Sequence, residues 1–395
     1  MIRTLFRGAA VIDGSGAAPR LADVLVEGDR IAAVGAGATA DGAVVVDATR
    51  KTLLPGLINL HVHLTTTGVW GAPEEAHDLA LIRAASAARR HLLGGTTTLR
   101  DMGSPGRAGQ VVRDAIRSGL MLGPRVVPSG RIISPTAQGK GGGRIVADDA
   151  SEVRKAARQL VEDEADVYKV VATGAGGTPG SNIGAATYSV AELATLVEEG
   201  KRLGRRVAAH VNGTAGTRNA VTAGVDTLEH LGWMGADGKL DVDDAVIAEI
   251  KAKGITIVPT MAVWYRPGYD DFASLSREQK MMRAVRKERT ASWLAMHRAG
   301  IRFATGTDTL DVVTREIELL VREMGLSALE AIRAATGSAA EALGLATEVG
   351  TIAPGMVADL VLVDGDPIGD LGALRRVSHV YRSGVPMVED GRLMQ

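Results

Sequence analysis

The chain has 395 residues, of which 46% are hydrophobic and 23% are charged, as in an ordinary globular protein. A net charge of -1 and an aromatic content of 3% exclude the basic surface and the stacking side chains typical of nucleic-acid binding. The absence of cysteine excludes disulfides, thiolate metal ligands and a cysteine nucleophile, so any bound metal must be held by nitrogen and oxygen.

The N-terminal stretch MIRTLFRGAAVIDGSG is a poor match for a signal peptide, because Asp13 and Gly14 interrupt its short apolar run. No run of about 18 apolar residues indicates a transmembrane helix. We therefore expect a cytoplasmic protein that has neither nucleic acid nor membrane as a partner.

Both ends of the chain are rich in short predicted strands. Residues 1–56 contain LFRGAAVID, ADVLVEGDRIAAVG and GAVVVDATRKTLLPG, in which β-branched residues alternate with Gly and Asp punctuation. Residues 347–395 contain similar runs in GTIAPGMVADLVLVDGDP and VSHVYRSGVPMVEDGRLMQ. We expect the two ends to pack together as one small composite β domain, a β-sandwich formed by residues 1–56 and 347–395.

The central region, residues 57–346, alternates short apolar runs with helical segments, which is typical of parallel β/α units. Helical patterns such as AHDLALIRAASAARRHLLGG, SEVRKAARQLVEDEA and VAELATLVEEGKRLG end in Gly or in a charged last turn. Eight such strands with intervening helices predict an α/β fold of the TIM type, a (β/α)8 barrel. The predicted strands are 57–64, 96–102, 125–133, 166–173, 206–212, 227–233, 255–263 and 302–309.

Histidines and one aspartate lie where these strands end. His61 and His63 form an H-x-H motif whose imidazoles share one face of a strand, although H-x-H alone is a weak signal. His210, His230 and Asp308 also end predicted strands, where the catalytic groups of this fold gather. The pattern therefore predicts a metal site at this end of the barrel. The other histidines are interpreted as surface or packing residues: His77, His91, His297 and His379.

Lys169 lies within the otherwise apolar strand DVYKVVAT. Burying an unpaired ammonium is expensive, so this position requires an explanation. The side chain could snorkel to solvent, or it could pair with Asp166 or Asp308. Alternatively, CO2 could convert the amine to a carbamate, an anion able to bridge two cations. Four histidines and an aspartate at neighbouring strand ends favour the carbamate.

This set of residues resembles the amidohydrolase superfamily. PGLINLHVHL (55–64) resembles its opening motif, residues 350–367 resemble its closing β segment, and GGTTTLRDMG (94–103) resembles the subgroup related to imidazolonepropionase and the Xaa-Pro dipeptidases. The resemblance implies a metal-dependent hydrolase of carbon–nitrogen bonds in a small molecule, with two divalent ions, typically Zn²⁺, and it is compatible with a homo-oligomer. The implied ligands are His61, His63 and Asp308 for the more buried metal, His210 and His230 for the second, and a carbamate on Lys169 bridging both.

Two departures from the family pattern concern the site. Asn59 stands where the family usually has an aspartate before H-x-H, which keeps the shape of the side chain but removes its charge. The dipeptidase-like members usually have Thr-Gly-Gly-His after the third strand, and this stretch reads TAQG at 136–139. The hydrolytic residues are therefore present, whereas the histidine expected to contact a dipeptide is absent.

The implied reaction is hydrolysis of an amide-type bond in a peptide-like, N-acyl amino acid, carbamate or urea substrate. A metal-bridging hydroxide is the expected nucleophile, and Asp308 is the expected proton shuttle to the leaving nitrogen. Two alternatives are a mononuclear deaminase or imidazolone-type cyclic amide hydrolase, and a non-catalytic scaffold. Lys169, and the lack of a glutamate just after His210, argue against the mononuclear enzyme, and the complete ligand set argues against the scaffold.

The substrate pocket is expected to form from loops on the catalytic face, including the Gly-rich stretches 135–150 and 174–187 and the stretch 264–275. Arg100 and Asp101, at the end of the second strand, are interpreted as part of an internal ion pair that supports the barrel. Candidate substrate contacts, for each of which ordinary packing is the alternative, are Tyr168, Asn212, Trp233, Trp264, Tyr265 and Arg266.

Overall fold

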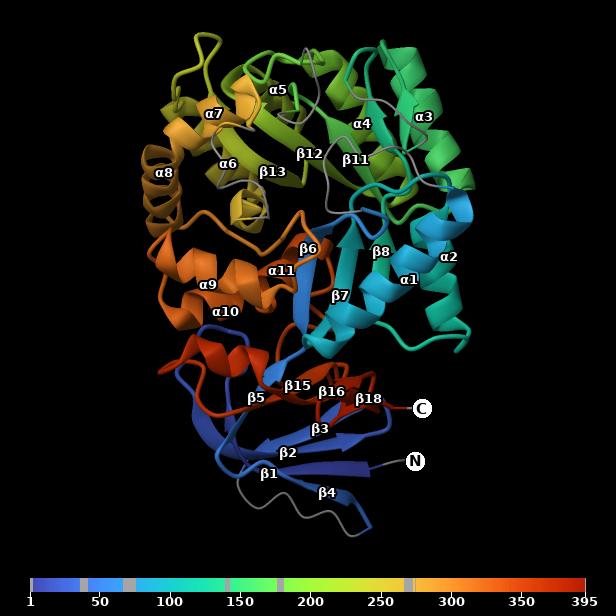
Figure 1. The fold of residues 1–395 in the computed structure, drawn as a ribbon, viewed down its shortest axis with the longest axis vertical. Helices are drawn as coiled ribbons and strands as arrows, with labels where there is room; N and C mark the ends of the chain where they lie inside the picture. Colours follow the sequence, from blue (N-terminus) through green and yellow to red (C-terminus); the bar gives the residue numbers. More distant parts are fainter. Residues whose placement is uncertain are drawn as a thin grey trace.

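The computed structural model describes residues 3–35, 42–66, 76–138, 143–175, 181–265, 273 and 275–394. Figure 1 shows a strand-rich region at one end of the molecule, which holds both chain termini, and a larger region of strands and helices beyond it. The chain passes into the larger region from β5 to β6, the first strand of that region, and it returns to the strand-rich region between α11 and β15.

Nine strands from the two ends of the chain form one hydrogen-bonded sheet, in the order β18-β17-β16-β15-β5-β1-β2-β3, with β4 paired to β1. β5 joins the two ends, because it pairs parallel with β1 and antiparallel with β15. The strands are β1 (Arg3–Val11), β2 (Arg20–Glu27), β3 (Arg30–Gly35), β4 (Val44–Asp47), β5 (Lys51–Pro55), β15 (Leu360–Asp364), β16 (Val377–Arg382), β17 (Val385–Glu389) and β18 (Arg392–Leu393).

This terminal sheet has its own hydrophobic core, in which the rings of Phe6 and Tyr381 meet edge to face at 5.0 Å between centroids. Both ends of the chain thus contribute to one β unit. β1 pairs with β2, β4 and β5, so the described strands are joined as one branched sheet rather than as the two separate sheets expected of a sandwich. The predicted domain limits, 1–56 with 347–395 and 57–346, stay a prediction.

The described strands of the central region pair in parallel, which confirms the predicted α/β class with parallel sheets. One sheet has the order β6-β7-β8, and the other has the order β10-β9-β11-β12-β13-β14. The strands are β6 (Leu57–Val62), β7 (Thr96–Asp101), β8 (Arg125–Pro128), β9 (Ile132–Ser134), β10 (Arg144–Val146), β11 (Val167–Val171), β12 (Arg206–Gly213), β13 (Thr227–Met234) and β14 (Thr256–Val258).

Helices follow most of these strands, and three of them match the helical patterns read from the sequence: α1, α3 and α4. None of the described helices is long and apolar enough to cross a membrane. The helices are α1 (His77–Leu93), α2 (Ala108–Arg117), α3 (Ala150–Glu162), α4 (Val190–Leu203), α5 (Thr214–Ala223), α6 (Asp244–Lys253), α7 (Arg277–Ala284), α8 (Arg286–Arg298), α9 (Thr314–Arg322), α10 (Ala328–Ala334) and α11 (Gly337–Leu343), with the 3-10 helices η1 (Met261–Tyr265) and η3 (Leu371–Arg375).

Two predicted strands are interrupted by local backbone constraints. The predicted strand 125–133 is divided into β8 and β9, because Gly130 between them adopts φ 65°, which breaks the extended conformation. The predicted strand 255–263 ends with β14, because Pro259 has no amide hydrogen for a ladder and Thr260 adopts φ 52°. The chain then turns directly into η1.

The prediction of a regular strand at 302–309 is wrong, although the segment lies where that strand is expected. Its one strand-like pairing is a parallel bridge from Phe303 to Ile257 of β14. On its other side it bonds to β6, where the Asp308 amide donates to the carbonyl of His61 at 2.8 Å. Asp308 has φ 52°, so the backbone leaves the extended region at the residue whose side chain enters the site.

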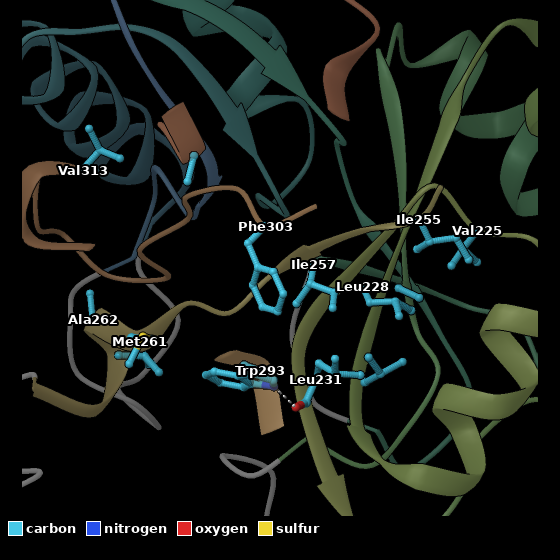
Figure 2. Close-up of a cluster of buried hydrophobic side chains, with 14 of the residues drawn as sticks. Val225, Leu228, Leu231, Ile255, Ile257, Met261, Ala262, Trp293, Phe303 and Val313 are labelled. Carbon is cyan, nitrogen blue, oxygen red and sulfur yellow. Dashed lines mark hydrogen bonds between the residues drawn. The ribbon is translucent and has the colours of Figure 1, made fainter. Parts of the chain in front are cut away.

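Figure 2 shows the part of the largest hydrophobic cluster that packs around β13 and β14. Trp293 of α8 is fully buried there, and its indole Nε1 donates to the carbonyl of Leu231 at 3.1 Å. Leu231 has φ 45° and follows His230, which has φ 73°. Unfavourable backbone conformations of this kind persist only where packing holds them, so this core supports the end of β13 that carries the histidine.

Candidate metal centre

Three of the predicted ligands meet at the junction of β6 with the segment 302–309. Asp308 Oδ1 lies 3.6 Å from His61 Nε2 and 3.4 Å from His63 Nε2. The ligand atoms of the three residues all lie within 4.8 Å of one another, a spacing that one metal ion can span. The backbone bond between Asp308 and His61 produces this proximity, because it holds the aspartate beside the H-x-H strand.

Two further imidazoles extend the group across the neighbouring strands. The ring centroid of His230 lies 5.0 Å from that of His61 and 4.4 Å from that of His210. β12 and β13 are adjacent and parallel, with Val211 opposite His230, so the two strand-end histidines lie side by side. The four predicted histidines therefore form one continuous cluster.

Lys169 completes this cluster from β11. Its side chain is 2% exposed, and its Nζ has no hydrogen-bond partner among the described residues. Snorkelling to solvent is thereby ruled out, and the proposed partner Asp166 instead pairs with Arg113 at 3.2 Å. Burial lowers the pKa of Lys169 to about 8, against the opposing effect of the Glu229 and Asp308 carboxylates.

Burial holds three histidines of the cluster, His61, His210 and His230, in the neutral form. Burial, and then the nearby charge of Lys169, lower the pKa of His210 to about 3. Burial likewise lowers the pKa of His61 and His230 well below the ordinary value of 6.5. A neutral imidazole keeps a lone pair for a metal, so these side chains are ready to act as ligands near neutral pH.

Acid should destabilise the metal-free protein through these histidines. Because the folded-state pKa of His210 is lowered, its unfolded form takes up a proton first as the pH falls below about 6.5. The free energy of unfolding should therefore decrease with falling pH, by about 1.4 kcal/mol per pH unit for this one residue. In urea titrations between about pH 6 and pH 4, the free energy of unfolding of His210→Gln should therefore fall less steeply than that of the wild type, by about 1.4 kcal/mol per pH unit. Wild type and variant should have parallel profiles above about pH 7.5; equal slopes in acid would contradict the buried neutral state.

Glu229 is a site residue that the sequence analysis missed. Its Oε2 lies 2.7 Å from His61 Nδ1, and its Oε1 accepts a hydrogen bond from Arg100 at 2.7 Å and one from Thr227 Oγ1 at 2.6 Å. A carboxylate at Nδ1 keeps the proton there and leaves His61 Nε2 as the ligand atom facing Asp308. The signal available in the sequence was a glutamate directly before His230 in a strand that is buried throughout.

The predicted internal ion pair at the end of the second strand exists, with Glu229 rather than Asp101 as the partner of Arg100. Arg100 also donates through Nε to the carbonyl of Leu60 at 2.6 Å, so it links β7 to both β6 and β13. Asp101 instead accepts hydrogen bonds from Ser104 Oγ at 2.6 Å and from the Leu64 amide at 3.1 Å. Each member of the Arg100-Asp101 pair thus fixes a different part of the site.

Two other imidazoles are oriented in the same way. His63 Nδ1 lies 3.0 Å from the carbonyl oxygen of Gly103, an acceptor, so the proton is on Nδ1. His230 Nδ1 lies 2.6 Å from the hydroxyl of Thr260. As with His61, Nε2 is the ring nitrogen left for a metal.

Asn59, in the place of the family's aspartate, has a positional role. It is fully buried, and its Oδ1 accepts hydrogen bonds from the amides of His61 at 3.3 Å and Thr307 at 3.2 Å. Its Nδ2 donates to Thr307 Oγ1 at 3.0 Å, which an ionised aspartate could not do. The asparagine therefore joins β6 to the segment 302–309 without adding a charge beside the cluster.

The predicted substrate contacts lie in different surroundings. Asn212 is beside the cluster, with Nδ2 2.8 Å from His210 Nε2. Trp233 and Trp264 are buried in the largest core, and the Trp264 ring lies 3.5 Å below the guanidinium carbon of Arg289. Arg266 lies outside the described residues.

Tyr168 is placed on the opposite side of its strand from Lys169, because successive side chains of β11 alternate between the two faces. Burial raises its pKa to about 12, and the charges that act on it belong to Arg205, Glu199 and Arg202, at the helical layer. These surroundings favour the packing alternative for Tyr168, and its assignment as a substrate contact stays a prediction. Tyr265 lies among arginines, with the guanidinium carbon of Arg286 5.3 Å from its ring.

The described parts of the two Gly-rich loops meet, since Ser181 Oγ donates to Gln138 Oε1 at 3.0 Å. Their centres, residues 139–142 and 176–180, and residues 266–272 and 274 of the third loop lie outside the described residues. The meeting of the loops agrees with their expected place on one face.

Comparison with known proteins identifies the family. The model of the amidohydrolase family matches residues 52–387, most of the chain. The chain belongs to the amidohydrolase family. This amidohydrolase is 29% identical to an ochratoxinase of Aspergillus niger, over 96% of the chain and 86% of that protein. It is 26% identical to an imidazolonepropionase of Salinispora tropica, over 93% of the chain and 90% of that protein.

Among solved structures, this amidohydrolase is similar to a Xaa-Pro dipeptidase that has methionine bound in its active site. The TM-score is 0.86 and the identity is 27%, and the match covers 97% of this chain and 99% of that chain. The protein is therefore an enzyme of the hydrolase class, and the subgroup read from residues 94–103 is confirmed.

Proposed function

We propose that this amidohydrolase holds two divalent metal ions, typically zinc, and releases an amino acid from an N-acyl amino acid or a peptide-like substrate. His61, His63 and Asp308 would hold the first ion, and His210 and His230 would hold the second. A carbamate on Lys169 would bridge the two. Nitrogen and oxygen donors of this kind suit Zn²⁺, Mn²⁺, Co²⁺ or Fe²⁺.

The observation that carries the proposal is the environment of Lys169. A primary amine that is 2% exposed, without a hydrogen-bond partner among the described residues, would be costly as a cation. Addition of CO2 to the neutral amine forms an N–C bond and releases one proton, which leaves an anion at the position of Nζ. The lowered pKa of Lys169, about 8, makes the neutral amine accessible near neutral pH.

Metal ions bound here would acidify a water molecule and polarise the carbonyl of the scissile bond. Asp308 Oδ1 lies beside both His61 Nε2 and His63 Nε2, so it would be next to a water molecule held at this site. We assign to this oxygen the uptake of the water proton and its delivery to the leaving nitrogen. Glu229, held by Arg100, would keep the His61 ring in one orientation during the reaction, because these hydrogen bonds do not involve the reacting atoms.

The similar proteins support the proposed substrate class. A Xaa-Pro dipeptidase that matches this chain along its whole length holds a free amino acid in its active site. Hydrolysis of an amide gives a free amino acid of this kind when that amino acid contributes either the carbonyl or the nitrogen of the cleaved bond. Carbamates and ureas, which contain the same carbon–nitrogen linkage, are the remaining members of the proposed class.

We also propose that the central strands close into a (β/α)8 barrel. β8 and β9 belong to one predicted strand, with β8 paired to β7 and β9 paired to β11. The segment 302–309 bonds to β14 at Ile257 and to β6 at His61. These links support a continuous ring with the candidate metal centre at one mouth.

Metal analysis and a hydrolysis screen test the proposal together. The protein is reconstituted with zinc in bicarbonate buffer and assayed with N-acyl amino acids, dipeptides, aryl carbamates and phenylureas. We expect two zinc ions per chain and the release of free amino acid from the first two groups. One zinc per chain would favour the mononuclear alternative, and no zinc would favour a scaffold, so either result overturns the proposal.

A further inference from the structure

We infer that Glu316, on α9, is a positioning residue for the candidate metal centre and acts on His230 through Thr260. The link begins at η1, which follows β14 and Thr260 directly in the chain. Glu316 is fully buried and bonds to the first turn of η1 with both carboxylate oxygens. Oε1 accepts from the Met261 amide and Oε2 accepts from the Ala262 amide, each at 2.8 Å.

This clamp fixes the backbone next to Thr260. Thr260 has φ 52°, a conformation that a β-branched residue adopts only when its surroundings hold it. Pro259 before it and the clamped amides after it leave little freedom for the threonine to relax. Thr260 is also fully buried, so its hydroxyl must find its partners within the protein.

The hydroxyl of Thr260 decides which nitrogen of His230 carries the proton. It donates its single hydrogen to the carbonyl of Pro259 at 2.8 Å. It therefore meets His230 Nδ1, 2.6 Å away, as an acceptor, so the imidazole is protonated at Nδ1. Nε2 then keeps its lone pair. Glu316 thus sets the tautomer of His230 without touching it.

α9 also follows Asp308 closely in the sequence, since the helix begins at Thr314. One carboxylate therefore connects the element after the aspartate ligand to the element that orients His230. A residue that only stabilised the fold would have no specific effect on the protonation of one imidazole, and this difference makes the inference testable.

The test measures the tautomer of His230 in the metal-free protein, by ¹H–¹⁵N correlation spectra of ¹⁵N-histidine-labelled samples assigned with His230→Gln. Wild type and Thr260→Ser, which keeps the hydroxyl, should show the proton on Nδ1. Thr260→Val and Glu316→Gln should lose that preference. Glu318→Gln is the matched control, because Glu318 lies on the same helix and pairs with Arg315 instead of η1.

Protonation at Nε2 in wild type, or an unchanged tautomer in folded Thr260→Val and Glu316→Gln, would overturn the inference. If Glu316→Gln does not fold, Glu316→Asp replaces it, because the shorter carboxylate can reach fewer of the η1 amides and should weaken the same preference.

A second measurement rests on the proposed binuclear site. Zinc titration against a chelator should show an affinity loss of about 10–100-fold for the second metal in Glu316→Gln and Thr260→Val, with the first metal retained. Equal loss of both metals would assign Glu316 a merely structural role. A wild type that binds one zinc would overturn the binuclear proposal, whereas the tautomer result would still decide the role of Glu316.

Discussion

Asp308→Asn should remove most of the turnover while the fold and the bound metal are retained. Asparagine keeps the size of the side chain and one oxygen ligand, but its amide cannot take up a proton from the attacking water. General acid–base groups contribute about 10²–10⁴-fold to the rate, so a decrease of that size in kcat is expected with little change in KM. Steady-state kinetics and metal analysis of the same preparation measure both quantities.

The matched control for this variant is Asp311→Asn. Asp311 is exposed on the same connection, three residues further along the chain, and it contacts Thr309 rather than the histidines. This control should keep normal turnover. If Asp308→Asn turned over substrate at a near-normal rate, Asp308 would not be the proton carrier, although it could remain a metal ligand.

Lys169→Ala should lose the second metal and with it about a thousandfold of turnover, which corresponds to about 4 kcal/mol of transition-state stabilisation. The reason is that the variant removes the only side chain proposed to bind both ions. It also leaves a space at the end of β11 that a small carboxylate can enter. Propionate or acetate should therefore restore part of both the metal content and the turnover.

Native mass spectrometry provides an independent measurement, because the wild type should carry the mass of one CO2 that the variant lacks. Lys155→Ala, at an exposed position of α3, should keep the adduct, both metals and full turnover. Two metals and normal turnover in Lys169→Ala would contradict the bridging role of this lysine.

The grouping of the candidate ligands could be predicted from the sequence because it rests on two local rules. Parallel strands bring their carboxyl ends to one edge, and His61, His210 and His230 lie on three such strands, His61 near the end and the other two near the middle. Lys169 stood out because a cation in a run of valines conflicts with the cost of burial. The structure places these side chains together, as both rules require.

The groups around the ligands could not be predicted in the same way, because they depend on contacts distant in sequence. Glu229 meets His61 across 168 residues, and Glu316 reaches η1 across 55. The irregular segment 302–309 has the sequence pattern of a strand, because its apolar and threonine residues have high β-propensity. Only the three-dimensional contact shows why a glycine is needed there: a Cβ on Gly306 would lie 2.6 Å from the Cβ of His61.

The pairing of β5 with β15 has a consequence for how the protein is made. Thr52 of β5 donates a hydrogen bond to the carbonyl of Gly365, directly after β15, so these partners are separated by 313 residues. During synthesis β5 emerges early, and its partner edge stays open until nearly the whole chain has left the ribosome. An exposed strand edge can pair with other chains, so premature termination before β15 should yield an aggregation-prone product even though every candidate metal ligand has already been translated.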